Sequence, residues 1–138
     1  AVDPGNGSVS LDEQVQVTGS VNTVNGQVAL QTGARVGGSL ENVNGRISLA
    51  AAEVAGDIET VNGDVFVGAG SRVDGGIHVE ENRGWFKHNL SRNPKVTIES
   101  GAVVRGPLRF EREVDLYLGA GATVGKLEGV TPRTKRIP

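Results

Sequence analysis

The sequence predicts an all-β protein: a single-stranded parallel β-helix, triangular in section, with about six coils of about 18–20 residues each. Three observations predict this fold. A multi-position pattern recurs at a nearly constant period, apolar residues alternate within each repeat, and glycine and valine reach 21 residues each among 138. We expect residues 1–138 to form a single solenoid domain, with an inserted loop at 80–95 and a tail at 129–138.

The repeat is anchored by four Asn-Gly pairs at almost equal spacing. After each pair come two apolar residues at alternate positions, then a further apolar site, a glycine and a third apolar site. A valine precedes the next Asn-Gly, and we expect most valines to face inward. The asparagines of the pairs are Asn6, Asn25, Asn44 and Asn62.

Each part of this unit has a physical reading. Alternation with a period of two is typical of short strands with one buried face. Asn and Gly at fixed positions indicate corners, where the backbone takes a positive φ. Three strands and three corners fit one unit, and stacked units share their stability with their neighbours. We expect the four asparagines to form a side-chain ladder along one corner.

The pattern resumes beyond residue 95, with one unit beginning at Val96 and another at Leu116. Between Val65 and Val96 the chain has about twelve residues more than one coil needs. This insertion holds the single Trp, next to a Phe and among cations. We expect it to contact a protein partner, a glycan or an anionic envelope surface; the alternative is that the rings pack back on the solenoid wall. Its candidate interaction residues are Arg83, Trp85, Phe86, Lys87 and Arg92.

Charge is divided along the chain. Residues 1–82 carry a net charge of −8 and residues 83–138 a net charge of +6. In a rod whose axis follows the sequence, this division favours end-to-end self-association or binding of an anionic surface by the basic half. The alternative is that both halves are solvated surfaces without a partner.

The composition excludes several chemistries. Without Cys there is no disulfide framework, iron–sulfur cluster or thiol nucleophile. We expect no catalytic residue, no metal site and no cofactor: Asp57, Glu59 and Asp64 occupy positions that face water, and His78 lies at an outward position, separate from His88 in the loop. Nucleic-acid binding is not expected, because outside the inserted loop the basic residues are not interleaved with stacking aromatics. A carbohydrate-active β-helix enzyme is the least favoured alternative.

The segments GARVGGSLENVNGRISL, EVAGDIETVNGDVFVGAGSRVDGGIHVE and ESGAVVRGPLRF carry a family resemblance. Their V-x-G-x-[LI] cadence resembles the bactofilins, the polymer-forming bacterial cytoskeletal proteins. It also resembles adhesin-like repeat proteins exported by Gram-negative bacteria, as do the GWF and FEREVDLYL segments. The resemblance implies a right-handed β-helix and a non-enzymatic role as a cell-envelope scaffold or adhesin-like module, exported to the periplasm or cell surface. The alternative is a bactofilin-like filament former in the cytoplasm.

Overall fold

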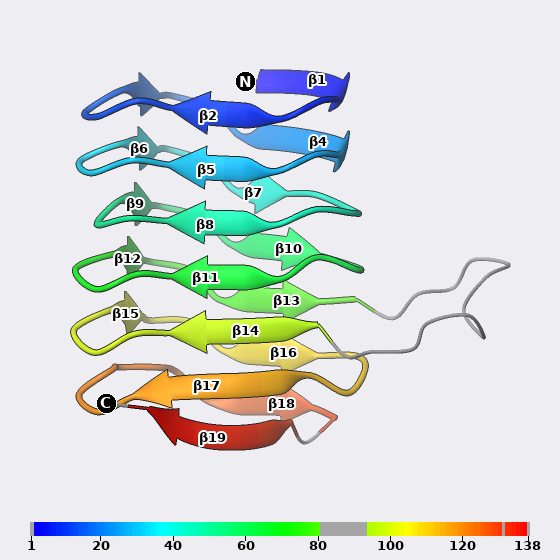
Figure 1. Cartoon of the computed structure of the whole chain (residues 1–138), viewed down its shortest axis with the longest axis vertical. Coiled ribbons are helices and arrows are strands. Elements are labelled where there is room, and N and C mark those ends of the chain that lie inside the picture. Colours follow the sequence, from blue (N-terminus) through cyan, green and yellow to red (C-terminus); the bar gives the residue numbers. More distant parts are fainter. Residues whose placement is uncertain (1, 81–93, 131, 138) are drawn as a thin grey trace, which may run out of the picture.

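The computed structural model describes residues 2–80, 94–130 and 132–137, and all its regular elements are β-strands. The strands form three parallel sheets that run along the axis of a solenoid of about six coils (Figure 1). The prediction of an all-β parallel β-helix is therefore confirmed. Followed from the N-terminal coil in Figure 1, the near strands run left and the far strands run right, so the coils wind with a right hand.

The first five coils contribute one strand to each sheet in turn, and the remaining coils contribute strands to the first and second sheets. The first sheet contains β1 (Val2–Asn6), β4 (Val21–Asn25), β7 (Leu40–Glu41), β10 (Ile58–Thr60), β13 (Ile77–Val79), β16 (Leu108–Phe110) and β18 (Leu127–Gly129). The second contains β2 (Val9–Leu11), β5 (Val28–Leu30), β8 (Ile47–Leu49), β11 (Val65–Val67), β14 (Lys95–Ile98), β17 (Asp115–Gly119) and β19 (Arg133–Ile137). The third contains β3 (Gln16–Val17), β6 (Arg35–Val36), β9 (Glu53–Val54), β12 (Arg72–Val73) and β15 (Val103–Val104).

The core is built from aliphatic columns that run parallel to the axis. In the second sheet, Val28 pairs with Ile47, Ile47 with Val65, and Val65 with Val96, and all four side chains are buried. Parallel, in-register pairing places equivalent side chains directly above one another, about 4.8 Å apart. The alternation read from the sequence therefore becomes one continuous hydrophobic core. Its largest fully buried side chain is Phe110.

A ladder of asparagine side chains runs along the corner between the first and second sheets. Asn44 Nδ2 donates to Asn25 Oδ1 over 2.8 Å, and Asn62 Nδ2 donates to Asn44 Oδ1 over 2.9 Å. In the backbone register Asn6 pairs with Asn25, but the side chain of Asn6 lies outside what the structure describes. Arg112 also reaches this corner, where its guanidinium donates to Asn62 Oδ1 over 3.1 Å and to the Val61 carbonyl oxygen.

The insertion leaves the stacking intact. Val65 pairs with Ile47 of the preceding coil and, across the insertion, with Val96 of the following one. The other two sheets also continue in register, with Val73 beside Val104 and Ile77 beside Leu108. The extra residues fall between β13 and β14, at the corner where the chain passes from the first sheet to the second. The rod therefore continues past this point as though no residues had been added.

The C-terminal segment also joins the solenoid. The sequence analysis placed residues 129–138 in a tail, but residues 133–137 form β19, which pairs with β17. Thr134 and Arg136 occupy the positions beside Leu116 and Leu118. Because these positions carry polar side chains, the apolar alternation that marks the other strands is missing here.

Candidate functional site

The outer face of the first sheet carries two columns of side chains. The residues of the first column are Asn22, Glu41, Glu59, His78, Arg109 and Glu128. Two positions further along the chain lie Val24, Val43, Val61, Glu80 and Glu111. The valines in this second column face outward, and Val24 is 47% exposed. Valine and carboxylate side chains therefore share one surface.

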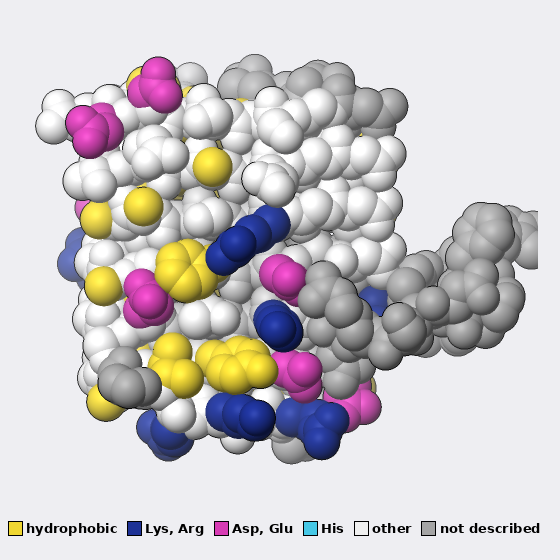
Figure 2. Space-filling view, in the orientation of Figure 1, with side chains coloured by type: hydrophobic (Ala, Val, Ile, Leu, Met, Phe, Trp, Pro, Cys, Tyr) yellow, Lys and Arg dark blue, Asp and Glu magenta, His cyan; other side chains and the backbone are white. Residues whose placement is uncertain are grey.

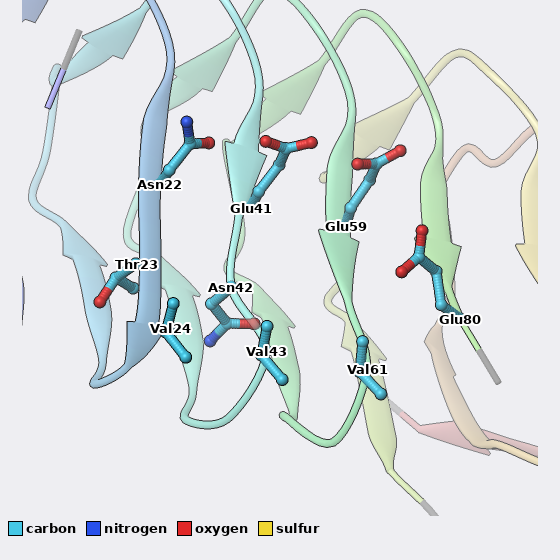
Figure 3. A pocket seen from close by; sticks show the side chains of 9 residues that line it. All are labelled: Asn22, Thr23, Val24, Glu41, Asn42, Val43, Glu59, Val61 and Glu80. Atoms are coloured by element: carbon cyan, nitrogen blue, oxygen red, sulfur yellow. The ribbon is translucent and has the colours of Figure 1, made fainter. Parts of the chain in front are cut away.

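The two columns enclose a groove of about 340 Å³. Figure 3 shows its lining, in which the Glu41, Glu59 and Glu80 side chains come from three successive coils. The remaining lining residues are Asn22, Thr23, Val24, Asn42, Val43 and Val61. Asn42 is only 5% exposed, and its Oδ1 has no hydrogen-bond partner among the described residues. Asn42 Nδ2 donates to the Gly45 carbonyl oxygen over 3.0 Å, which holds this side chain toward the corner of the coil.

Two carboxyl groups in the groove share a proton. A hydrogen bond between Glu41 and Glu59, together with burial and the charge of Glu59, raises the pKa of Glu41 to about 7. With its amide oriented to donate, Asn22 also bonds Glu41 Oε2 over 2.6 Å. Because two adjacent carboxylates repel each other, the protonated form of Glu41 is the stable one below neutral pH.

This pair makes the stability of the protein depend on pH. A carboxyl whose pKa is raised by folding stabilises the folded state while it is protonated, and that contribution is lost as the pH rises from about 4.5 through about 7. Glu41→Gln keeps a donor for Glu59 and removes the titration. In a buffer with a metal chelator, we expect it to raise the free energy of unfolding at pH 8 by about 1 kcal/mol or less, because the pair is screened by solvent, with no gain at pH 4.5.

Urea unfolding at the two pH values measures this effect, and Glu13→Gln, an exposed carboxylate outside the groove, is the matched control. The other charged groups around the pair are Glu80 and His78, and both variants leave them in place. Equal effects of the two substitutions at both pH values would contradict a shared proton.

His78 lies at the centre of a second set of contacts on this face. Its Nε2 lies 2.6 Å from Glu111 Oε2, and its Nδ1 lies 3.6 Å from Glu59 Oε1. Glu59, His78 and Glu80 each offer one ligand atom within 4.8 Å of the other two. All three side chains are partly buried, and the His78 side chain is 22% exposed. This grouping of an imidazole with two carboxylates has the composition of a cation site.

The residues singled out from the sequence have different outcomes. Arg83, Trp85, Phe86, Lys87 and Arg92 lie outside the described residues. The acidic residues near residue 60 do not form one cluster. Asp57 Oδ1 accepts a hydrogen bond from the Gly76 backbone over 2.8 Å, and Asp64 Oδ1 accepts one from the Lys95 backbone over 2.9 Å. Only Glu59 belongs to the groove.

Sequence reasoning missed Glu41, Glu80 and Glu111, and it treated His78 as an isolated surface residue. A signal for them was present in the aligned repeats. The residues that follow the inward Leu40, Ile58 and Ile77 are Glu41, Glu59 and His78, so one column could be read directly. The contact of His78 with Glu111 joins two different coils and requires the register on both sides of the insertion.

The outer face of the second sheet carries charges of both signs. Its edge alternates in sign along the axis: Arg46, Asp64, Lys95, Asp115, Arg133. Arg46 also covers the ring of Phe66, with its guanidinium carbon 5.5 Å from the ring centroid. Figure 2 shows hydrophobic and basic side chains gathered toward the C-terminal coils of this face, with acidic groups among them. Because these charges partly cancel, this face offers a ligand a smaller net charge than the carboxylate-rich outer face of the first sheet does.

None of the described residues forms a helix of the length and apolarity that crossing a bilayer requires. The fold by itself does not specify an activity, because function depends on the site that a fold carries. Comparison of the chain with protein-family models, curated proteins and solved structures gave no match, so the function is argued from the geometry of the solenoid and its faces.

Proposed function

We propose that the protein is a non-enzymatic structural and interaction protein, a β-solenoid scaffold or adhesin-like module of the bacterial cell envelope. The observation that carries the proposal is the unbroken register of all three sheets across the insertion. The scaffold and the inserted segment are separable parts: the coils stack in register on both sides of the segment, and the segment joins the rod at one corner. Such an arrangement suits a rigid rod that presents a contact element at its side.

The energetics support this division of roles. In stacked-repeat proteins, each coil is stabilised mainly by its neighbours. The coils before and after the insertion keep their buried columns, including Val65, Val96, Ile77 and Leu108. Lengthening a surface connection costs little, since each doubling of a loop adds only about 0.6 kcal/mol. A corner can therefore carry a recognition segment with little loss of stability.

The test uses the full chain and two probes, isolated peptidoglycan sacculi and vesicles that contain phosphatidylglycerol. We expect the protein to sediment with one of them. We expect Trp85→Ala combined with Phe86→Ala to reduce the bound fraction at least tenfold while thermal unfolding stays unchanged. Phe66→Ala, on the outer face of the second sheet, controls for the loss of an aromatic ring elsewhere. A chain that sediments with neither probe, or a double variant that binds as well as the original, would contradict the proposal.

The charge division favours a second candidate, a bactofilin-like filament former. Among the described residues, those at 2–80 carry a net charge of −7 and those from 94 to 137 a net charge of +3, and the two groups lie in successive coils, so opposite charges are separated along the rod. Attraction between unlike halves of two copies would be strongest at low ionic strength. Sedimentation at low and high salt distinguishes the candidates: a filament former assembles at low salt, and a monomer at high concentration in low salt eliminates this function.

A further inference from the structure

We propose that Glu59, His78 and Glu80 form a binding site for a divalent transition-metal ion, with zinc as the ion that fits best. The site lies on the outer face of the first sheet, where three side chains from two neighbouring coils approach one another. One ligand atom from each residue lies within 4.8 Å of the others. The site is an addition to the scaffold function, which would stand without it.

The hydrogen bond on the far side of the imidazole supports a metal-binding role for His78. Nε2 lies 2.6 Å from Glu111 Oε2, and in the neutral tautomer that carries its proton on Nε2 the ring donates to this carboxylate. Nδ1 is then left unprotonated, and it is the nitrogen that faces Glu59. Metal-binding histidines characteristically donate their second ring nitrogen to a carboxylate, which fixes the tautomer and orients the ring. Glu111 is the carboxylate that would position the His78 ring in this way.

The ligand set indicates the class of ion. An imidazole and two carboxylates suit zinc, which commonly takes three protein ligands and a water molecule. Magnesium prefers oxygen ligands throughout and near-ideal octahedral geometry. Zinc lies about 2.0–2.2 Å from its ligands, so the three atoms would need to approach to roughly 3.4 Å from one another. The Glu59 side chain is 31% exposed and can make this adjustment without disturbing the core.

The surroundings favour a cation over a simple ion pair. Glu41 lies beside Glu59 in the same column, and Glu80 lines the same groove. Among the described residues, the nearest cation in the column is Arg109 on β16, one strand beyond His78.

The experiment titrates the full chain with zinc alone and follows heat and the imidazole nitrogen resonances. We expect one zinc per chain, a shift of the His78 Nδ1 resonance, and no displacement by an equal concentration of magnesium. His78→Gln, Glu59→Gln and Glu80→Gln should each weaken binding at least tenfold. Glu111→Gln should weaken it by about tenfold or more and change the tautomer of His78 in the metal-free protein.

Two matched controls separate this site from other ligands. Glu128→Gln makes the same change on the same sheet, two strands from His78, and His88→Gln removes the other histidine of the chain. Both should bind zinc as the original chain does. The proposal is overturned if zinc does not bind, if His78→Gln binds it unchanged, or if the resonances of His88 shift in place of those of His78.

Discussion

Gly45→Ala should be among the most damaging single substitutions in the solenoid. Gly45 has a φ of +124°, and a Cβ at this position would lie 2.0 Å from the Gly26 carbonyl oxygen of the preceding coil. The positive φ costs about 1–3 kcal/mol for a residue with a side chain, and the clash forces two coils apart at a cost of about 1–3 kcal/mol more. The free energy of unfolding in urea measures the sum.

Gly7 supplies the control for this prediction. It has a similar φ of +136°, but an added Cβ would meet nothing within 4 Å. Gly7→Ala therefore tests the backbone strain alone, and we expect a loss of about 1–3 kcal/mol. If the two variants lose the same stability, the close contact between stacked corners does not limit the choice of residue at Gly45.

Phe110→Ala should cost about 3–5 kcal/mol, because it empties the volume of the largest fully buried side chain. Phe110 stands in the inward column of the first sheet, beside Val79 on one side and Gly129 on the other. Neither neighbour can fill the space. Since coils are stabilised by their neighbours, we expect amide protection to fall most in β13, β16 and β18 and least in β5.

A Phe→Ala substitution on the outer face of the solenoid provides the comparison. Phe66→Ala removes a ring from the outer face of β11, together with its contact to Arg46. We expect it to cost about 1–2 kcal/mol. Hydrogen exchange and urea unfolding of the two variants would contradict this account of the core if the partly buried outer ring proved as important for stability as the fully buried one.

The repeating parts of the fold were predictable because their causes are local. Alternating apolar residues such as Val28 and Leu30 determine which side of a strand is buried, and an Asn-Gly pair such as Asn44-Gly45 determines where the chain turns. Four successive units repeat both signals, so an ambiguous position in one coil is resolved by the next. β19 was missed because Thr134 and Arg136 replace the apolar residues on which the pattern depends.

The candidate site was less predictable, because it depends on the register between coils. Glu59, His78 and Glu80 come together through the stacking of β10 on β13, and neither coil contains the whole set. The position of Glu111 also depends on how β16 aligns with β13 after the insertion. Outward positions are not constrained by packing, so the repeat indicates which positions share a column but not which residue types occupy them.

The stacked corners also have a consequence for the chemical ageing of the protein. In a flexible chain, an Asn-Gly sequence deamidates readily, because the glycine nitrogen attacks the asparagine side-chain carbonyl. In the folded solenoid the Gly26 nitrogen donates to the Asn44 carbonyl oxygen over 3.0 Å, and the side chain of Asn25 is held by that of Asn44. The folded structure thereby protects the side-chain amide of Asn25, which is more easily lost by deamidation in the unfolded chain. The extent of deamidation at these Asn-Gly pairs should therefore increase with the time that the protein has spent unfolded.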